Sequence, residues 1–490
     1  MKTVELAITL GYIVICILIG VWVSRRVSES SDDYWVAGRK IGTFTNSWAI
    51  MAALGSGGSI LGVNGLAYKL GIPYTFAMYA GAVAGFPIAA ILVARQLRNF
   101  RVRTVPEFLD FRYNNKLLNI IVPLVILVCM EVYVVAQLKA AGVTAVYLLG
   151  VPYKTAVVLT ALVFTLYVSI GGMWAVTLTD VLQGILMVTM VVIVAIAVFM
   201  GFGGFASTIQ QGTAAFPALG AVVDKPIISY AGAFLVWFIA ACTVPHLVMR
   251  VFTARDAHSA RLSLNYSMLI YAVMIFFGVI AVASAGHILF PDLADADTVF
   301  LKVMEHYMPS RFMAGLAVAA VMAAVMSTTD ALILAVSSAA VNDIYKKHFN
   351  PQANEKTIFK MGLVMTWVAG LLAIYFALNP PKLLTMLYTA AVGLLGSTLF
   401  APIILGIWWK KATSQGALWS CISGGVSYLY LLWFTPMPPL SHVLVSVPLS
   451  FVVFFAVSLM TQSAVDSKVL ERVAVGHERE LEVAEAQARS

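Results

Sequence analysis

Long apolar runs separated by short polar segments are the dominant pattern of this 490-residue chain. The run 312–341 is almost free of charged residues, and as a helix it is long enough to cross a hydrocarbon core about 30 Å thick. Similar runs recur along the chain, which predicts an all-α integral membrane protein with about thirteen transmembrane helices. The predicted spans are 4–24, 44–70, 74–95, 117–147, 152–171, 177–201, 227–250, 263–289, 311–345, 358–378, 383–409, 415–435 and 440–461.

The composition excludes a soluble protein. Hydrophobic residues make up 61% of the chain and charged residues 11%, which is more apolar surface than a soluble core can bury. The four cysteines fall in four separate apolar runs, so we interpret them as packing residues. The first run, 4–23, is too long for a signal-peptide core and is followed by Arg25 and Arg26, so we expect it to be a retained span.

The charge distribution predicts the orientation in the membrane. The formal charge of +8 comes from bases in short connections and does not indicate a nucleic-acid partner. Alternate connections are rich and poor in Lys and Arg, and basic connections face the cytoplasm. We therefore predict a multi-pass protein of the cell (inner) membrane with its N-terminus outside and its C-terminus in the cytoplasm. The bases assigned to the cytoplasmic side are Arg25, Arg26, Arg39, Lys40, Arg95, Arg98, Arg101, Arg103, Arg250, Arg255, Arg261, Lys346, Lys347, Lys356, Lys360, Lys410 and Lys411.

The polar segments contain no domain that could carry soluble chemistry. Segments 202–226 and 290–310 are predicted to be long external connections, and the tail after Thr461 to be cytoplasmic and partly disordered. Seven histidines are scattered over separate spans and connections, without a cluster of nucleophile and base or of metal ligands. We therefore expect a protein that is not an enzyme and that acts within the membrane.

Two predicted spans contain helix-breaking residues at mid-membrane. The second span carries Gly55-Ser56-Gly57-Gly58-Ser59, which indicates local unwinding, although close helix packing through Gly58 and Gly62 would also explain it. The seventh span carries Pro245, which removes a backbone hydrogen bond and would either break the helix or only kink it. The next residue, His246, could anchor the break by hydrogen bonding or act as a titrating relay. Broken helices at matching positions of two halves indicate the substrate site of a secondary transporter.

Hydroxyl and carboxyl groups near the middle of the ninth span suggest a cation path. Ser327 and Thr328 are adjacent, and Asp330 follows within a turn. Hydroxyls are tolerated in a membrane helix because they can bond to a backbone carbonyl, whereas a buried carboxylate is costly and indicates function.

Five motifs along the chain can be compared with those of known families. They are Ala323-Ala324-Val325-Met326-Ser327-Thr328 with Asn342-Asp343-Ile344-Tyr345, Gly171-Gly172-Met173-Trp174-Ala175-Val176 with Thr179-Asp180 and Gln183, Pro245-His246 with Arg250, Asp33-Tyr34 with Gly38-Arg39, and Trp408-Trp409-Lys410 with Gly416-Ala417. Together they resemble the sodium:solute symporter family, over residues 4–460. In Ala67-Tyr68-Lys69 and Val244-Pro245-His246, for example, the chain is most similar to the branch of pantothenate and short-chain monocarboxylate symporters.

The resemblance implies a leucine-transporter-type fold of two five-helix inverted repeats. The expected parts are an extra N-terminal helix and loop (1–43), the first repeat (44–201), the second repeat (202–409), two C-terminal helices (410–462) and a cytoplasmic tail (463–490).

The resemblance also implies a sodium site between the second and ninth spans. Its ligands would be the carbonyls of Ala52, Gly55 and Ala324 and the hydroxyls of Ser327 and Thr328.

Position 54 departs from one branch of the family. The proline-transporting branch has an acid there, whereas this chain has Leu54, which makes a proline-type arrangement doubtful.

Two aspartates form a candidate second cation or proton site. In family members with a second sodium site, the aspartate at position 180 joins oxygens of the ninth span, where this chain has Asp330. Two nearby carboxylates would share a proton or hold a cation. The alternatives are a helix cap formed by Thr177, Thr179 and Asp180, and a structural hydrogen bond for Asp330.

The candidate substrate-binding residues lie around the break in the second span. Glu131 near the middle of the fourth span could line the substrate cavity or titrate, or it could pair with Lys139. The candidates are Ala53, Ser56, Gly57, Glu131, Tyr133, Gln137 and Trp237.

Taken together, the sequence predicts a sodium-coupled symporter that imports a small organic anion, such as pantothenate or a short-chain monocarboxylate, by alternating access. Na⁺ is the expected coupling ion, no organic cofactor is expected, and the protein is expected to function as a monomer in the lipid bilayer. Two alternatives stay open: a proton-coupled carboxylate transporter of the same fold, and a sodium-coupled amino-acid (proline-like) symporter.

Overall fold

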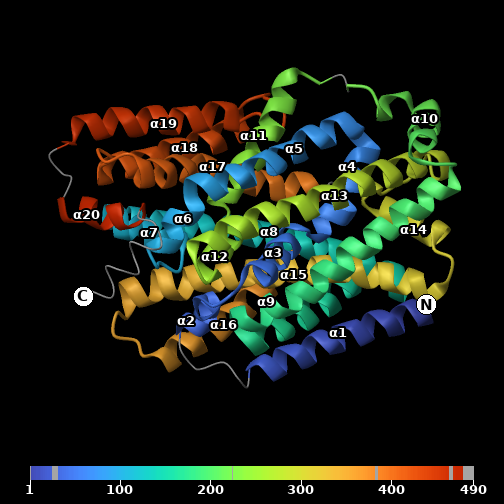
Figure 1. The fold of residues 1–490 in the computed structure, drawn as a ribbon, viewed down its shortest axis with the longest axis horizontal. Coiled ribbons are helices and arrows are strands. Elements are labelled where there is room, and N and C mark those ends of the chain that lie inside the picture. The colour runs from blue at the N-terminus through green and yellow to red at the C-terminus, as the bar shows by residue number, and fades with distance from the viewer. Residues whose placement is uncertain (1, 25–30, 223–224, 381–383, 463–466, 478–490) are drawn as a thin grey trace.

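Long helices running side by side make up nearly all of the molecule (Figure 1). The computed structural model describes residues 2–24, 31–222, 225–380, 384–462 and 467–477. The bases Arg25 and Arg26 and the last part of the tail, 478–490, lie outside these residues. Within the described residues the only β-structure is an isolated bridge between Ile41 and Ala254.

The helices account for the predicted spans. Among the described residues, eleven segments are long and apolar enough to cross a membrane, a bent pair is a further candidate span, and Tyr153–Ser169 is a shorter apolar helix. The long helices are α1 (Thr3–Ser24), α5 (Ile72–Ala89), α8 (Leu118–Leu149), α9 (Tyr153–Gly201), α11 (Ile227–Thr243), α13 (Ala257–Leu289), α15 (Arg311–Ser338), α16 (Glu355–Ala377), α17 (Leu384–Trp408), α18 (Ser414–Phe434) and α19 (Val443–Met460).

Both predicted helix breaks are confirmed. The second span consists of α3 (Thr43–Leu54), a short π-helix η2 (Gly58–Gly62) and α4 (Val63–Leu70), and its two halves are bent by 59°. The seventh span breaks at Val244, whose extended backbone separates α11 from α12 (Pro245–Thr253). Pro245 begins the second half, as a residue without a backbone N–H can do at a helix start.

The fifth and sixth predicted spans form one continuous element with a kink. In α9 the backbone of Gly172 leaves the helical region at φ 58° and ψ −164°, so the second half begins there and not at 177. The alternative that Thr177, Thr179 and Asp180 cap this helix is therefore wrong. The hydroxyls of Thr177 and Thr179 instead donate to carbonyls of the preceding turn.

The connections contain more structure than the sequence predicted. The two long segments that were predicted to be external hold α10 (Phe205–Ala215), the 3₁₀ turns η4 (Pro217–Leu219) and η5 (Ala296–Thr298), and α14 (Val299–Tyr307). The described part of the tail forms α20 (Ser467–Val475). It is followed by His477, whose ring bonds to the Ile407 carbonyl at 2.9 Å. The remaining short elements are α2 (Ser31–Val36), η1 (Ala37–Arg39), η3 (Ala90–Ala94), α6 (Arg95–Asn99), α7 (Val105–Tyr113) and η6 (Ala339–Phe349).

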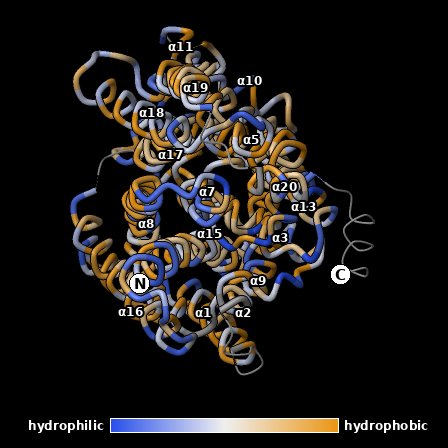
Figure 2. Tube along the Cα trace, turned by 90° about the vertical axis from the view of Figure 1, so that its left-hand side faces the viewer, coloured by the Kyte–Doolittle hydropathy of each residue, from blue (hydrophilic) through white to orange (hydrophobic). Residues whose placement is uncertain are grey.

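Helix α15 lies at the centre of the bundle. It packs against α1, α3, α8, α9 and α16, and 94% of its most apolar stretch is buried. Many helices carry hydrophobic residues on the outside, as expected for surfaces that face lipid (Figure 2). The start of α1 and the last described helix, α20, lie at opposite ends of the bundle (Figure 1). The break between α3 and α4 faces α15, and this places the candidate site in the core.

Candidate ion and substrate site

The break after α3 frees two backbone carbonyls. In a continuous helix the carbonyls of Ala52 and Ala53 would accept from the N–H groups of Ser56 and Gly57. Here the Ser56 N–H donates to the Leu54 carbonyl at 2.8 Å, and the Gly57 N–H donates to the side chain of Gln137. The carbonyls of Ala52 and Ala53 are therefore available to groups on another helix.

Helix α15 supplies those groups. The Ser327 hydroxyl lies 2.9 Å from the Ala52 carbonyl and 3.2 Å from that of Ala324. The Thr328 hydroxyl donates to the Ala53 carbonyl at 3.1 Å. All five residues are fully buried. The group contains neutral oxygens from two helices, which is the type of oxygen set that suits a desolvated monovalent cation such as Na⁺.

The predicted sodium ligands are thus largely brought together. Ala52, Ala324, Ser327 and Thr328 belong to this group, and Gly55 ends α3 at the start of the break. Ala53, which the sequence suggested for the substrate, contributes its carbonyl to the oxygen group instead. The ligand assignment itself stays a prediction.

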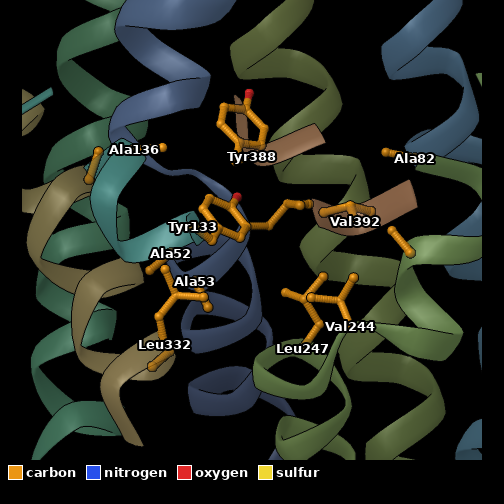
Figure 3. Packing of buried hydrophobic residues seen from close by; sticks show 14 of the residues in the cluster. Ala52, Ala53, Ala82, Tyr133, Ala136, Val244, Leu247, Leu332, Tyr388 and Val392 are labelled. Atoms are coloured by element: carbon orange, nitrogen blue, oxygen red, sulfur yellow. The ribbon is translucent and has the colours of Figure 1, made fainter. Parts of the chain in front are cut away.

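Five aromatic side chains gather next to the same break; we call them the aromatic cluster: Tyr79, Tyr133, Trp237, Tyr271 and Tyr388. The rings of Tyr133 and Tyr388 stack with their centres 4.9 Å apart, near Ala52 and Ala53 (Figure 3). The hydroxyls of Tyr79 and Tyr388 are 3.1 Å apart, and Trp237 lies 6.0 Å from Tyr79 and 5.9 Å from Tyr388. The cluster joins α5, α8, α11, α13 and α17 around one point.

The broken helix contacts this cluster directly. The Ser59 hydroxyl is 3.1 Å from that of Tyr271, and a Cβ added to Gly58 would lie 2.4 Å from the Tyr388 ring. Gln137 accepts from the Gly57 N–H at 3.1 Å. The structure therefore brings the predicted substrate residues Ser56, Gly57, Tyr133, Gln137 and Trp237 together. The sequence analysis missed Tyr79, Tyr271 and Tyr388, because single tyrosines in apolar spans carry no spacing signal.

Several buried polar atoms in this region have no hydrogen-bond partner among the described residues. They are the amide nitrogen of Gln137, the indole nitrogen of Trp237 and both ring nitrogens of His246. His246 contacts the edge of Tyr133, with ring centres 5.5 Å apart, and makes no hydrogen bond in the described part of the chain. The expectation that His246 anchors the break by hydrogen bonding is therefore wrong. Buried donors without partners are costly, and a ligand could satisfy them.

A buried ion pair joins α12 to α9. Arg250 on α12 bonds to the Asp180 carboxylate and donates to the Thr177 hydroxyl at 2.7 Å. Arg250 is fully buried, so its assignment to a cytoplasmic connection is wrong. The helix α12 continues beyond the predicted span end and carries this side chain into the core.

Asp330 is the unpaired member of this region. Both of its carboxyl oxygens are buried and lack a hydrogen-bond partner among the described residues. The structural hydrogen bond considered for Asp330 is therefore not formed. Asp330 on α15 and Asp180 on α9 lie on two helices that pack against each other.

Glu131 is separated from the other candidates. It lines an apolar pocket between α8, α15, α16 and α17, together with residues such as Val128 and Leu372. Its suggested partner Lys139 instead bonds to Asp297 at 2.8 Å. Glu131 therefore does not belong to the group around the break.

Comparison with known proteins supports this architecture. The sequence profile described as "Sodium:solute symporter family" matches residues 34–424. The chain belongs to the sodium:solute symporter family. The protein is thus a transporter and not an enzyme, as the sequence predicted.

Relatives within the family are named for different substrates. The sodium/proline symporter of Escherichia coli is 30% identical and covers 85% of this chain and 86% of its own. The osmoregulated proline transporter of Bacillus subtilis is 28% identical, with 88% and 89% covered. The sodium/pantothenate symporter of Escherichia coli is also 28% identical, with 86% and 89% covered. These identities do not separate the two substrate classes.

Solved structures agree with the fold. A Na⁺-coupled sialic acid symporter in a substrate-bound outward-open state has a TM-score of 0.81 at 20% identity, covering 93% of this chain and 98% of that one. This chain therefore has the leucine-transporter-type fold that the sequence predicted.

Proposed function

We propose that this symporter imports a small organic anion, most simply a monocarboxylate such as pantothenate or a short-chain acid, together with sodium. The observation that carries the proposal is the set of unpartnered N–H donors of Gln137 and Trp237 beside the break in the second span. A carboxylate accepts hydrogen bonds only, so it could satisfy both donors.

The absence of a competing acid supports an anionic substrate. Position 54 is Leu54, and Glu131 lies in a separate pocket. The carboxylate of Asp297 is paired with Lys139, and that of Asp180 with Arg250. In the described part of the chain, therefore, no free carboxylate is seen to contact the aromatic cluster.

Sodium would bind at the oxygen group between α3 and α15. The proposed ligands are the carbonyls of Ala52, Gly55 and Ala324 and the hydroxyls of Ser327 and Thr328. The two hydroxyls now donate to carbonyls, and on ion binding they would turn so that their lone pairs face the cation.

One broken segment connects the two sites. The carbonyls of Ala52 and Ala53 lie at the oxygen group, and Gly57 and Gly58, a few residues on, contact Gln137 and Tyr388. An ion that fixes the end of α3 would therefore also order the substrate side of the break. This supplies a physical route for coupling sodium to substrate binding.

Asp180 and Asp330 are proposed as a second cation or proton site, because Asp330 is buried without a partner. If this site binds sodium, Asp330→Asn should reduce the number of sodium ions per cycle without a new dependence on pH. If it carries a proton, the same change should remove a pH-gradient contribution to uptake.

The connections rich in Lys and Arg support an orientation in the cell membrane with the N-terminus outside and the C-terminus in the cytoplasm. The start of α1 and the last described helix, α20, lie at opposite ends of the bundle, as this requires (Figure 1). We propose that the monomer is the transport unit, because the oxygen group and the aromatic cluster are both built from one chain.

Counterflow into proteoliposomes tests the substrate. The purified protein is reconstituted with an inward sodium gradient, and labelled pantothenate, short-chain acids, proline and neutral sugars are compared. We expect sodium-dependent uptake of a monocarboxylate and competition by other monocarboxylates at millimolar concentration. Competition by proline but not by monocarboxylates would favour the proline-like alternative. Uptake driven by a pH gradient and indifferent to sodium would favour the proton-coupled one.

A further inference from the structure

Glu131 lies in the middle of α8 but points away from the transport sites. It is roughly 20 Å along the helix from Leu118, at 1.5 Å per residue. Tyr133 and Gln137, which contact the aromatic cluster and the break, project from the other side of the helix, since residues two apart differ by about 200° in direction. A role in the central site therefore does not explain this acid.

The pocket that Glu131 lines has a volume of about 600 Å³. Its walls are mostly apolar side chains of α8, α15, α16 and α17, including Val128, Val336, Leu372 and Phe376, and Asn379 lies just beyond the end of α16. Val128 is 61% exposed, Phe376 51% and Leu372 46%, and all three lie on helices that cross the membrane. The pocket therefore opens toward the surrounding lipid.

The carboxyl group is the one acidic group among the described residues that line the pocket, and one of its oxygens is buried without a hydrogen-bond partner. Lys139, the nearest base along α8, is bonded to Asp297. A carboxyl at this depth is costly unless a partner compensates it. Among the described residues that line the pocket, the one other polar side chain is the neutral amide of Asn379, which cannot neutralise a carboxylate. A cationic ligand that enters from the bilayer could.

We propose that this pocket binds a lipophilic amine from the membrane. The apolar body of the ligand lies against α8 and α16, and its protonated nitrogen pairs with the Glu131 carboxylate. A plain acyl chain would fill the walls but leave the carboxyl group unpaired. An ammonium group also neutralises the charge, which a neutral hydroxyl cannot do. The volume is within the range of sites for small organic molecules.

Photolabelling of the full-length protein in proteoliposomes tests the proposal. The probe is a decylamine that carries a diazirine near the end of its chain, and the matched neutral probe is the corresponding decanol. We expect the amine to label residues of α8 and α16 at least fivefold more than the alcohol. Glu131→Gln should abolish the difference in labelling between amine and alcohol. Val368→Phe fills the pocket from a lipid-facing position and leaves the acid in place, so it should reduce labelling by both probes.

Two controls keep the result interpretable. Glu305→Gln changes an exposed acid outside the pocket and should leave the labelling pattern as in the wild type. Each variant is also checked for a wild-type melting temperature in detergent, so that misfolding is not read as lost binding. Equal labelling by amine and alcohol, or unchanged amine labelling in Glu131→Gln, would overturn the proposal.

Discussion

The ammonium of Lys139 on α8 lies 2.8 Å from the carboxylate of Asp297 in the segment before α14, and both side chains are buried. The same carboxylate accepts from the backbone N–H of Leu384 at the start of α17, at 3.4 Å. A Cβ added to Gly65 on α4 would lie 2.7 Å from it. One aspartate of a connecting segment therefore holds α4, α8 and α17 together at the end of the broken span.

Removing the cation should open this end of the molecule. Lys139→Met leaves the Asp297 carboxylate buried without a counter-charge, which costs several kcal/mol. We expect faster modification of a reporter cysteine at position 385, beside Gly62, by a membrane-impermeant maleimide added outside. The double variant Lys139→Met/Asp297→Asn should return toward the wild-type rate. Lys302→Met, at an exposed lysine on α14, is the matched control and should have no effect.

The same contact predicts a pH dependence. Burial raises the pKa of the Asp297 carboxyl above its ordinary value, and the nearby Lys139 acts in the opposite direction. A group with a higher pKa in one state binds more protons there, so that state is favoured as the pH falls. Because maleimide reacts with the thiolate, the rate is expressed relative to that of a free thiol at the same pH. We expect this relative rate to fall on acidification toward the raised pKa and to rise as the pH rises through it. Asp297→Asn should show a flat relative profile over this range; the same slope in that variant would refute the assignment.

The oxygen group predicts which hydroxyls matter for sodium. Ser327→Ala or Thr328→Ala each removes one proposed oxygen ligand, and we expect the half-saturating sodium concentration for uptake to rise about tenfold, or ~1.4 kcal/mol. Thr329→Ala is the matched control, since that hydroxyl bonds to the Val325 carbonyl of its own helix at 2.6 Å. A similar rise in all three variants would argue against a specific ion site.

The ion pair of Arg250 and Asp180 predicts a stability effect. Arg250→Met would leave Asp180 buried and uncompensated, at a cost of about 3–5 kcal/mol, and should lower the melting temperature in detergent. Asp180→Leu/Arg250→Met should recover part of the loss. Arg255→Met, which breaks an exposed pair with Asp256, should cost less than about 1 kcal/mol. An equal loss for Arg250→Met and Arg255→Met would contradict this account.

Features that depend on local chain chemistry could be predicted from the sequence. The spans follow from runs of apolar residues, and the two breaks follow from the glycine cluster at 55–58 and from Pro245. The oxygen group was predicted from the adjacent hydroxyls of Ser327 and Thr328 and from the family resemblance. Each of these signals lies within a few neighbouring residues.

Features that depend on partners distant in the chain could not be predicted in this way. Lys139 and Asp297 are 158 positions apart, and Arg250 reaches Asp180 across 70 positions. Arg250 was assigned to a cytoplasmic connection because a base at a predicted span end usually lies there. The rings of Tyr79, Tyr271 and Tyr388 meet only because five helices converge on the break.

Two glycines of the break, Gly57 and Gly58, are surrounded by different side chains, so substituting them should have different effects. A Cβ on Gly57 would lie 2.5 Å from Val325 and 2.8 Å from Ala140, both of which are packed between α8 and α15. A Cβ on Gly58 would instead lie 2.4 Å from the ring of Tyr388. We therefore expect Gly57→Ala to lower thermal stability and expression. Gly58→Ala should fold but displace Tyr388, and so raise the half-saturating substrate concentration severalfold.

The sodium requirement distinguishes these two effects. Gly58 is not among the proposed sodium ligands, so sodium binding to Gly58→Ala, measured by sodium-dependent protection against heating, should stay within twofold of wild type. Gly58→Ala/Tyr388→Leu removes the clashing ring and should regain stability but not substrate affinity, since the ring itself is part of the proposed substrate site. Wild-type substrate affinity in Gly58→Ala would place the substrate away from Tyr388 and the aromatic cluster.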